Sequence, residues 1–180
     1  MLGYSSGCVE IPIPRRLYEK LREMRVDVES KVVDALLGEL DLNPGEEMEI
    51  HVDLARQFLE KGRKLADRDP VQASEKLYKA AEEAVKALIL KHGIREVVER
   101  VRERGRWRAE DFFEAISRFR RIYGDDVKRW WSIAWELHAW GLHEAKATPS
   151  YVRERIVDVE NLVKLAVGGE STREATSRRR

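Results

Sequence analysis

Two histidines in the last third of the chain are the side chains best suited to acid–base chemistry. His138 and His143 are five residues apart, and an imidazole changes its charge near neutral pH. Five residues of an α-helix correspond to a rotation of about 140°. We therefore expect His138 to face the core and His143 to face the polar side of one helix.

These histidines do not belong to a recognisable metal motif. His143-Glu144 begins like the zinc-protease motif, but the second histidine of that motif would stand at position 147, which is alanine. His51 and His92 are too far apart in sequence to add a ligand pattern. The chain also lacks a glycine-rich phosphate loop, a Gly-x-Ser-x-Gly elbow and an acidic calcium loop. We therefore predict no metal and no cofactor.

Polar and aromatic side chains around the histidines could hold a different kind of ligand. On an α-helical wheel, Arg129, Ser132 and Glu136 share the polar side with His143. Four of the five tryptophans stand within eleven positions, at Trp130, Trp131, Trp135 and Trp140. Such a cluster either stacks on a base or packs in the core, and we favour the core, with most sides of the helix buried. The candidate binding residues are Ser132, Trp135, Glu136 and Tyr78.

The elements that must position these residues are helices, each marked by start and stop signals. Asn43-Pro44-Gly45-Glu46 predicts a capped helix that runs to about Ala66, and Asp69-Pro70 opens a second one that Gly93 ends. A tight turn between two long helices makes an antiparallel hairpin. Further helices are expected over residues 94–104, 109–123, 126–146 and 150–167, with Asp126 and Ser150 as caps. Residues 43–168 are therefore predicted to form an all-α, up-and-down antiparallel bundle.

The second helix of the hairpin, which Asp69-Pro70 opens, is expected to be the best buried. Its apolar residues share one broad face, while Glu75 with Lys79 and Glu82 with Lys86 form i,i+4 pairs on the opposite face. Its many alanines allow a neighbouring helix to approach closely. Ser74 falls within the apolar arc, and we expect its hydroxyl to bond back to the preceding turn.

Residues 1–42 are predicted to form a separate arm, with a short strand at residues 9–13 and two helices. Pro14 and Asp27 would open the helices. The arm resembles ribbon-helix-helix DNA-binding arms, whose outward strand side chains would here be Glu10 and Pro12. An acid and a proline are poor readers of base edges, so we expect packing or dimerisation and keep DNA contact as a weaker alternative. Residues 169–180 are expected to be a disordered basic tail.

Charge and composition narrow the functional classes. Lys and Arg number 34 against 33 Asp and Glu, a net charge of +1, which by itself points to neither nucleic acid nor membrane. No stretch approaches the roughly 20 apolar residues of a membrane-spanning helix. The single Cys8 allows no intramolecular disulfide, and the first residues lack a signal peptide, so we expect a cytoplasmic protein. Few amides among many charges fit either adaptation to heat or an ordinary charged surface.

Two segments carry a resemblance to a known family. Residues 71–88, VQASEKLYKAAEEAVKAL, and residues 137–145, LHAWGLHEA, resemble the two hallmark segments of the archaeal PaREP family. The resemblance spans about residues 10–167. The family resembles the HEPN class of helical domains, which includes nucleotide-binding partners of nucleotidyltransferases and ribonuclease toxins, often as homodimers.

The resemblance implies a binding or interaction module rather than an enzyme. Ribonucleases of the HEPN class carry an arginine, then four to six residues, then a histidine. Here the position five before His143 is His138 and the position five before His138 is Ile133, while Arg129 precedes His138 by nine residues. We therefore expect a homodimeric module for a nucleotide, RNA or protein partner. The alternative that the resemblance implies is a degenerate, metal-independent ribonuclease of a toxin–antitoxin-like system, with His143 as the base and His138 or Arg129 contacting the phosphate.

Overall fold

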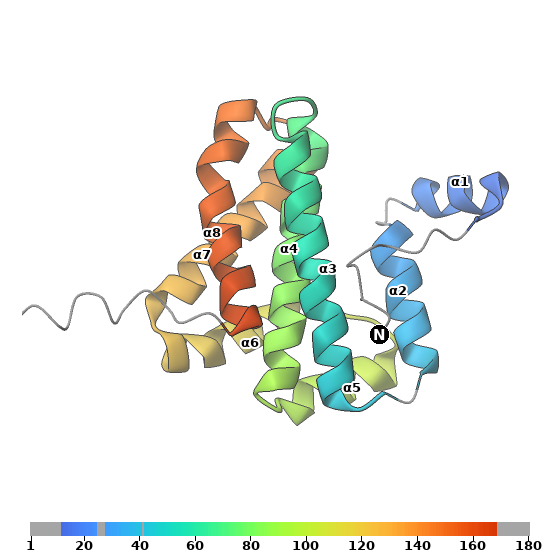
Figure 1. Ribbon diagram of the computed structural model, residues 1–180, viewed down its shortest axis with the longest axis vertical. Helices are drawn as coiled ribbons and strands as arrows, with labels where there is room; N and C mark the ends of the chain where they lie inside the picture. The colour runs from blue at the N-terminus through green and yellow to red at the C-terminus, as the bar shows by residue number, and fades with distance from the viewer. Residues whose placement is uncertain (1–11, 25–27, 41, 169–180) are drawn as a thin grey trace, which may run out of the picture. The chain divides into compact units, whose positions relative to one another are not determined.

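The computed structural model describes residues 12–24, 28–40 and 42–168, and the chain forms two compact units, Met1–Glu39 and Leu40–Arg180 (Figure 1). All regular structure within the described residues is helical, which confirms the all-α prediction. Within the described ranges no helix is long and apolar enough to cross a membrane. The tail at residues 169–180 lies outside the described residues.

The first unit contains two helices, α1 (Arg15–Glu23) and α2 (Val28–Glu39). Pro14 stands immediately before α1 as its N-terminal cap residue. Pro12 and Ile13 adopt no regular structure, and the remainder of the expected strand, including Glu10, lies outside the described residues. Asp27, the predicted cap of α2, also lies outside the described residues. The hypothesis that this arm reads DNA therefore stays a prediction.

The second unit is built around α4 (Pro70–Lys91), most of whose residues are buried. The preceding α3 (Pro44–Leu65) lies beside it in the predicted antiparallel hairpin (Figure 1). The other elements are α5 (Arg95–Arg104), α6 (Ala109–Tyr123), α7 (Asp125–Glu136), η1 (Leu137–His143) and α8 (Pro149–Val167). Of these, α8 and η1 make the most extensive contacts with α4.

The predicted caps of the hairpin are present. Asn43 Oδ1 accepts hydrogen bonds from the backbone N–H groups of Gly45 and Glu46 at 3.0 and 3.1 Å, and the Glu46 carboxylate accepts one from the N–H of Asn43. Asp69 Oδ1 accepts from the N–H of Gln72 at 3.0 Å. These bonds satisfy backbone donors that the first helical turn leaves free. The capping signals therefore fix where both long helices begin.

The starts of the last two long helices differ from the prediction. The helix that contains the tryptophans begins at Asp125, after Gly124, and not after Asp126. In α8 the cap is Thr148, whose Oγ1 accepts from the N–H of Tyr151, and Pro149 fills the first helical position. Ser150 is the second residue of that helix and not its cap. A threonine followed by proline makes the stronger start signal.

Three ionisable side chains are buried where α3 packs on α4. Glu83 lies between two bases: its Oε2 is 2.6 Å from Nδ1 of His51, and its Oε1 is 2.7 Å from Nζ of Lys86. The three side chains are 1%, 1% and 3% exposed in the order Glu83, His51, Lys86. The prediction that Lys86 lies on the polar face is therefore wrong. Trp107, whose ring centroid is 5.6 Å from Nζ of Lys86, contributes to covering that side chain.

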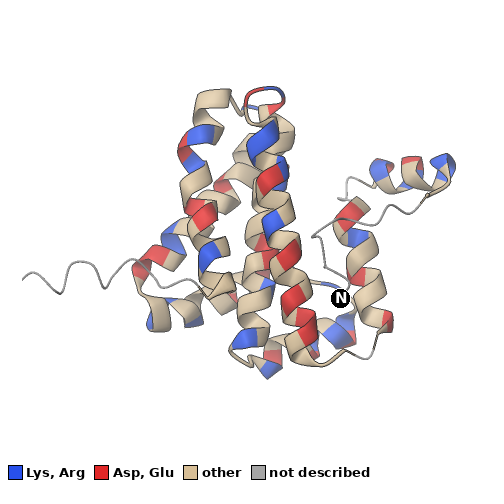
Figure 2. Ribbon diagram, viewed as in Figure 1, with Lys and Arg blue, Asp and Glu red and all other residues tan. Residues whose placement is uncertain are grey.

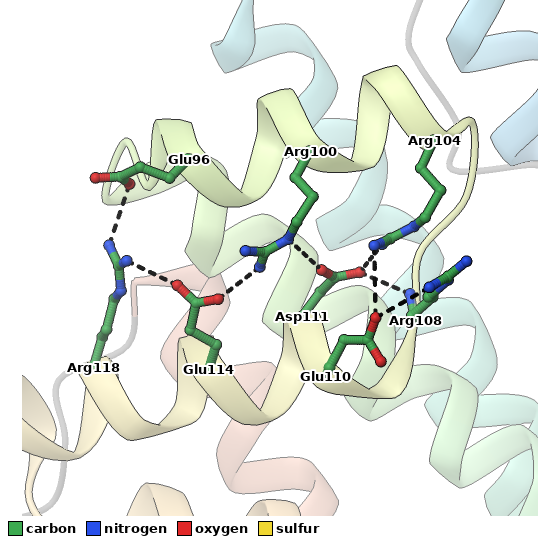
Figure 3. Close-up of polar contacts among 8 residues, drawn as sticks. All are labelled: Glu96, Arg100, Arg104, Arg108, Glu110, Asp111, Glu114 and Arg118. Carbon is green, nitrogen blue, oxygen red and sulfur yellow. Dashed lines mark hydrogen bonds and ion pairs between the residues drawn. The ribbon is translucent and has the colours of Figure 1, made fainter.

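Acidic and basic residues are interspersed along the helices (Figure 2). Between α5 and α6 their side chains form a continuous ladder (Figure 3). The ladder consists of Glu96, Arg118, Glu114, Arg100, Asp111, Arg104, Glu110 and Arg108. Asp111 is its one fully buried member. It accepts from Arg100 Nε at 3.1 Å, from Arg104, and from the backbone N–H of Arg108 at 2.8 Å. The ladder joins two helices that share few core residues.

Candidate functional site

The candidate histidines lie on η1, a seven-residue π-helix that continues directly from α7. Its backbone bonds join residues five apart, as in the bond from the N–H of Glu144 to the carbonyl of Ala139 at 3.3 Å. Residue i+5 therefore lies over residue i, and not on another face as in an α-helix. Nε2 of His143 is 3.1 Å from Nε2 of His138. The prediction that the two histidines face opposite sides is wrong because it assumed an α-helix.

A glycine allows η1 to lie against α4. A Cβ atom added at Gly141 would be 2.6 Å from Oγ and 2.8 Å from Cβ of Ser74, closer than real atoms approach. Ser74 Oγ donates to the carbonyl of Pro70 at 2.8 Å, which confirms its predicted structural role. The π-helix ends at His143, and two residues later Ala145 has a left-handed φ of 51°, which costs an alanine roughly 1–2 kcal/mol. Such local irregularities concentrate at functional sites.

Replacing Gly141 with alanine is expected to lower the free energy of unfolding by about 1–3 kcal/mol, the usual cost of overpacking. Urea unfolding of the purified variant measures this. In a Ser74→Gly background the colliding atoms are gone, so the same replacement should cost close to nothing. If Gly141→Ala lowers the free energy of unfolding equally in the two backgrounds, the collision with Ser74 is not the cause of the loss.

His138 is held neutral by its surroundings. Its ring stacks on Tyr78, with centroids 4.2 Å apart, and lies 5.4 Å from the ring of Trp135. Burial, helped by the nearby charges of His143 and Lys79, lowers its pKa to about 4. The Nδ1 atom is buried and has no hydrogen-bond partner within the described chain. A buried donor without an acceptor is rarer than a buried acceptor without a donor, so we place the proton on Nε2, where it donates to His143.

This arrangement determines what His143 presents to a ligand. Its Nε2 accepts a hydrogen bond from Nε2–H of His138, so the neutral ring carries its own proton on Nδ1. The exposed His143 therefore offers an N–H donor on Nδ1. Such a group suits holding a phosphate or carbonyl oxygen better than abstracting a proton.

Tyr78 and Trp135 form the inner wall of the site. Tyr78 is buried, and its pKa is raised by burial and by its hydrogen bond to the negatively charged Glu82, so the phenol stays protonated. Glu82 also pairs with Lys79 at 2.5 Å. The ring centroid of Trp135 is 6.0 Å from that of Tyr78 and 5.1 Å from that of Phe113. Tyr78 and Trp135 therefore lie together with the two histidines.

The other candidates have partners elsewhere. Arg129 pairs with Asp126 at 3.6 Å and with Asp158 at 3.5 Å. Ser132 Oγ donates to the carbonyl of Lys128 at 2.9 Å. Glu136 accepts hydrogen bonds from two side chains of α8. The predicted polar stripe is thus occupied by contacts within the bundle.

The sequence analysis missed a second aromatic group beside η1. Trp140 was expected in the core, but 38% of it is exposed, and its ring centroid is 4.6 Å from that of Tyr151. The guanidinium carbon of Arg155 lies 3.6 Å from the centroid of the Tyr151 ring, and Glu136 accepts from both Arg155 and Tyr151. Burial and the Glu136 charge raise the pKa of Tyr151 to about 12. The i,i+4 spacing of Tyr151 and Arg155 was the signal available in the sequence.

The described residues contain no group of three or more His, Cys, Asp or Glu side chains that could hold an ion. Cys8 lies outside them. The histidine pair could supply two nitrogen ligands, but the tautomer assigned above uses both Nε2 atoms in one hydrogen bond.

Residues 50–163 match the family model of the archaeal PaREP1/PaREP8 family, a shorter range than the residues 10–167 expected from the sequence. The chain is also similar to a crystal structure of a protein from Sulfolobus solfataricus, with 36% identity, coverage of 68% of this chain and 95% of that one, and a TM-score of 0.55. A solution structure of the same structural-genomics target matches at 36% identity, 68% and 90% coverage and a TM-score of 0.52. No curated protein matches the chain.

Proposed function

The chain belongs to the archaeal PaREP1/PaREP8 family, and we propose that it is a homodimer whose second unit is a HEPN-like module that binds a nucleotide or RNA at η1 without cleaving it. The observation that carries the proposal is the His138–His143 pair, in which a neutral, half-buried imidazole fixes the orientation of an exposed one. The N–H that His143 presents is a donor for phosphate or carbonyl oxygens. A donor held in place binds a ligand more tightly than one that must first be ordered.

Exposed aromatic surface on the same π-helix supports a nucleic-acid base as part of the ligand. Trp140 is exposed and its neighbour Tyr151 is fixed between it and Arg155. Bases stack on such rings at about 1–3 kcal/mol each, with little dependence on sequence. The chain's balanced charge is compatible with this kind of binding, since stacking does not need an extended basic surface.

Degenerate, metal-independent ribonuclease activity is the second candidate. It is supported by the exposure of His143, whose Nε2 lies 3.1 Å from Nε2 of His138, because an accessible histidine can act as a general base. It ranks second because Arg129, the arginine expected to contact the phosphate, is ion-paired with Asp126 and Asp158. A scissile phosphate would then lack this arginine as a positive group to stabilise its transition state.

We also propose a cytoplasmic setting at elevated temperature. The α5–α6 ladder supports the second part, because ion-pair networks lose less of their stabilisation on heating than isolated pairs do. Thermal unfolding of the purified protein checks it: a Tm below about 65 °C, within the mesophilic range, would contradict adaptation to heat.

Binding of fluorescein-labelled single-stranded RNA, measured by anisotropy, tests the proposed function. Trp140→Ala and His143→Ala are each expected to weaken binding about tenfold, through loss of one stacked base or one oriented donor. Arg129→Ala is the matched control and should change the affinity less than threefold. The labelled RNA should stay intact with or without EDTA.

Three outcomes decide between the candidates. If the wild-type protein binds neither RNA nor free nucleotides, the proposal is overturned and a protein partner becomes the next hypothesis. EDTA-resistant cleavage that His143→Ala abolishes establishes the ribonuclease instead. Binding that both variants retain at full affinity would place the ligand away from η1.

A further inference from the structure

The first unit is too small to form a core of its own. It comprises residues 1–39, and chains below about 40 residues are rarely stable without disulfides, metals or oligomerisation. The chain has a single cysteine, so an intramolecular disulfide is ruled out. Helix α1 contains no buried residue, and Ser30 is the one buried residue of α2. Neither helix buries an apolar side chain within the described residues.

Apolar side chains follow one side of α1, and several of the larger apolar side chains of α1 and α2 are exposed. Leu17, Leu21 and Met24 are spaced as i, i+4 and i+7, which places them on one face of α1. Leu17 is 53% and Met24 65% exposed, and Leu36 of α2 is 51% exposed. Contiguous exposed apolar faces in a folded protein mark surfaces that another molecule covers.

The two helices carry opposite charge. Helix α1 has four basic residues, Arg15, Arg16, Lys20 and Arg22, against Glu19 and Glu23. Helix α2 has three acidic residues, Glu29, Asp34 and Glu39, against Lys31. A basic helix and an acidic helix on one unit make that unit complementary to a copy of itself. In a two-fold arrangement, α1 of each chain can meet α2 of the other, so the favourable contact occurs twice.

We propose that the first unit is a dimerisation module, in which the apolar faces of α1 and α2 are covered by the same unit of a second copy of the chain, with α1 against the partner's α2. The proposal specifies where the homodimer of the proposed function is formed, and it does not depend on what the bundle binds. The family match begins at residue 50, so this module lies outside the matched range.

Multi-angle light scattering of the full chain tests whether the apolar faces hold the dimer. The wild-type protein is expected at twice its 21.0 kDa chain mass. Leu17→Asp combined with Leu36→Asp should reduce the mass to that of one chain. Ile122→Asp is the matched control, because Ile122 is a 56% exposed apolar residue of α6, and it should stay dimeric. A monomeric wild type, or a double variant that remains dimeric, overturns the proposal.

Charge reversal tests the pairing of α1 with the partner's α2. One variant carries Arg16→Glu and Arg22→Glu, and the other carries Asp34→Lys and Glu39→Lys. Each variant alone should be monomeric, because its α1 and α2 then share one sign. Mixing the two should restore a dimer that contains one chain of each, detectable by native mass spectrometry. Mixtures that stay monomeric, or variants that dimerise alone, overturn the α1–α2 pairing.

Anisotropy with labelled RNA separates this inference from the proposed function. Unchanged far-ultraviolet circular dichroism would show that the reversed variants keep their helices. Loss of the dimer with retained RNA binding supports the module and leaves the η1 proposal standing. A dimer that needs α1 and α2 but binds no RNA leaves the module standing and overturns the η1 proposal.

Discussion

Replacing Glu83 with alanine is expected to lower the free energy of unfolding at pH 7 by about 3–5 kcal/mol, the usual cost of removing one partner from a buried charge cluster. The variant leaves Lys86, 3% exposed, and His51, 1% exposed, without the carboxylate that both contact. Urea denaturation followed by circular dichroism measures the difference. The loss in free energy of unfolding should be several times larger than the loss on removing one partner of an exposed ion pair.

The pH dependence of this effect has a defined sign. Burial alone would raise the pKa of Glu83, but the charge of Lys86, followed by the bond to and charge of His51, outweighs it and lowers the pKa to about 2 from 4.5. A carboxyl whose pKa is lower in the folded state stabilises the fold above its unfolded pKa. The contribution is therefore complete above about pH 4.5 and is lost as the pH falls toward 2. The difference in free energy of unfolding between the wild type and Glu83→Gln should therefore decrease as the pH falls from about 4.5 toward 2.

Two controls make the Glu83 prediction specific. Glu60 pairs with Arg63 and its side chain is 55% exposed, so Glu60→Ala should cost less than about 1 kcal/mol. Replacing His51, Glu83 and Lys86 together by apolar residues of similar size should recover most of the lost stability, because no unpaired charge then stays buried. A Glu83→Ala variant that costs no more than Glu60→Ala would contradict the argument.

The positions of the long helices could be predicted because their signals are local. Asn43 and Asp69 cap the turns that directly follow them, and a side chain bonded three residues along the chain needs no knowledge of the rest of the fold. The burial of Lys86 could not be predicted in this way. Its partner Glu83 is three residues away, but His51 and Trp107 come from other elements, and only the folded chain brings them together.

The geometry of the candidate site could not be predicted from local sequence signals either. The sequence identified His138, His143, Tyr78 and Trp135, and the structure brings these four together. Their geometry depends on the π-helix, which changes the relation of residues five apart from opposite faces to direct contact. No residue type in the segment indicates that change by itself. Gly141 is meaningful only beside Ser74 of α4, a contact between residues distant in sequence.

Asp111→Ala is expected to lower the free energy of unfolding by about 3 kcal/mol, the second large effect. The side chain is 0% exposed, holds Arg100 and Arg104, and accepts the backbone N–H of Arg108 at the start of α6. Loss of the cap contributes about 1 kcal/mol and loss of the charge-assisted bonds the remainder. For a chain of this length the Tm should fall by roughly 6–12 °C.

Asp111→Asn separates the two contributions, because the amide oxygen can still accept the N–H of Arg108 while the negative charge is lost. We expect it to cost about 2 kcal/mol, less than alanine. Glu110→Gln, at a ladder position whose side chain is 64% exposed, should cost less than about 1 kcal/mol. Because Asp111 is buried, its effect should persist in 1 M NaCl, where exposed pairs are screened. An Asp111→Ala loss that disappears at high salt would show that the ladder acts only at the surface and does not fasten α5 to α6.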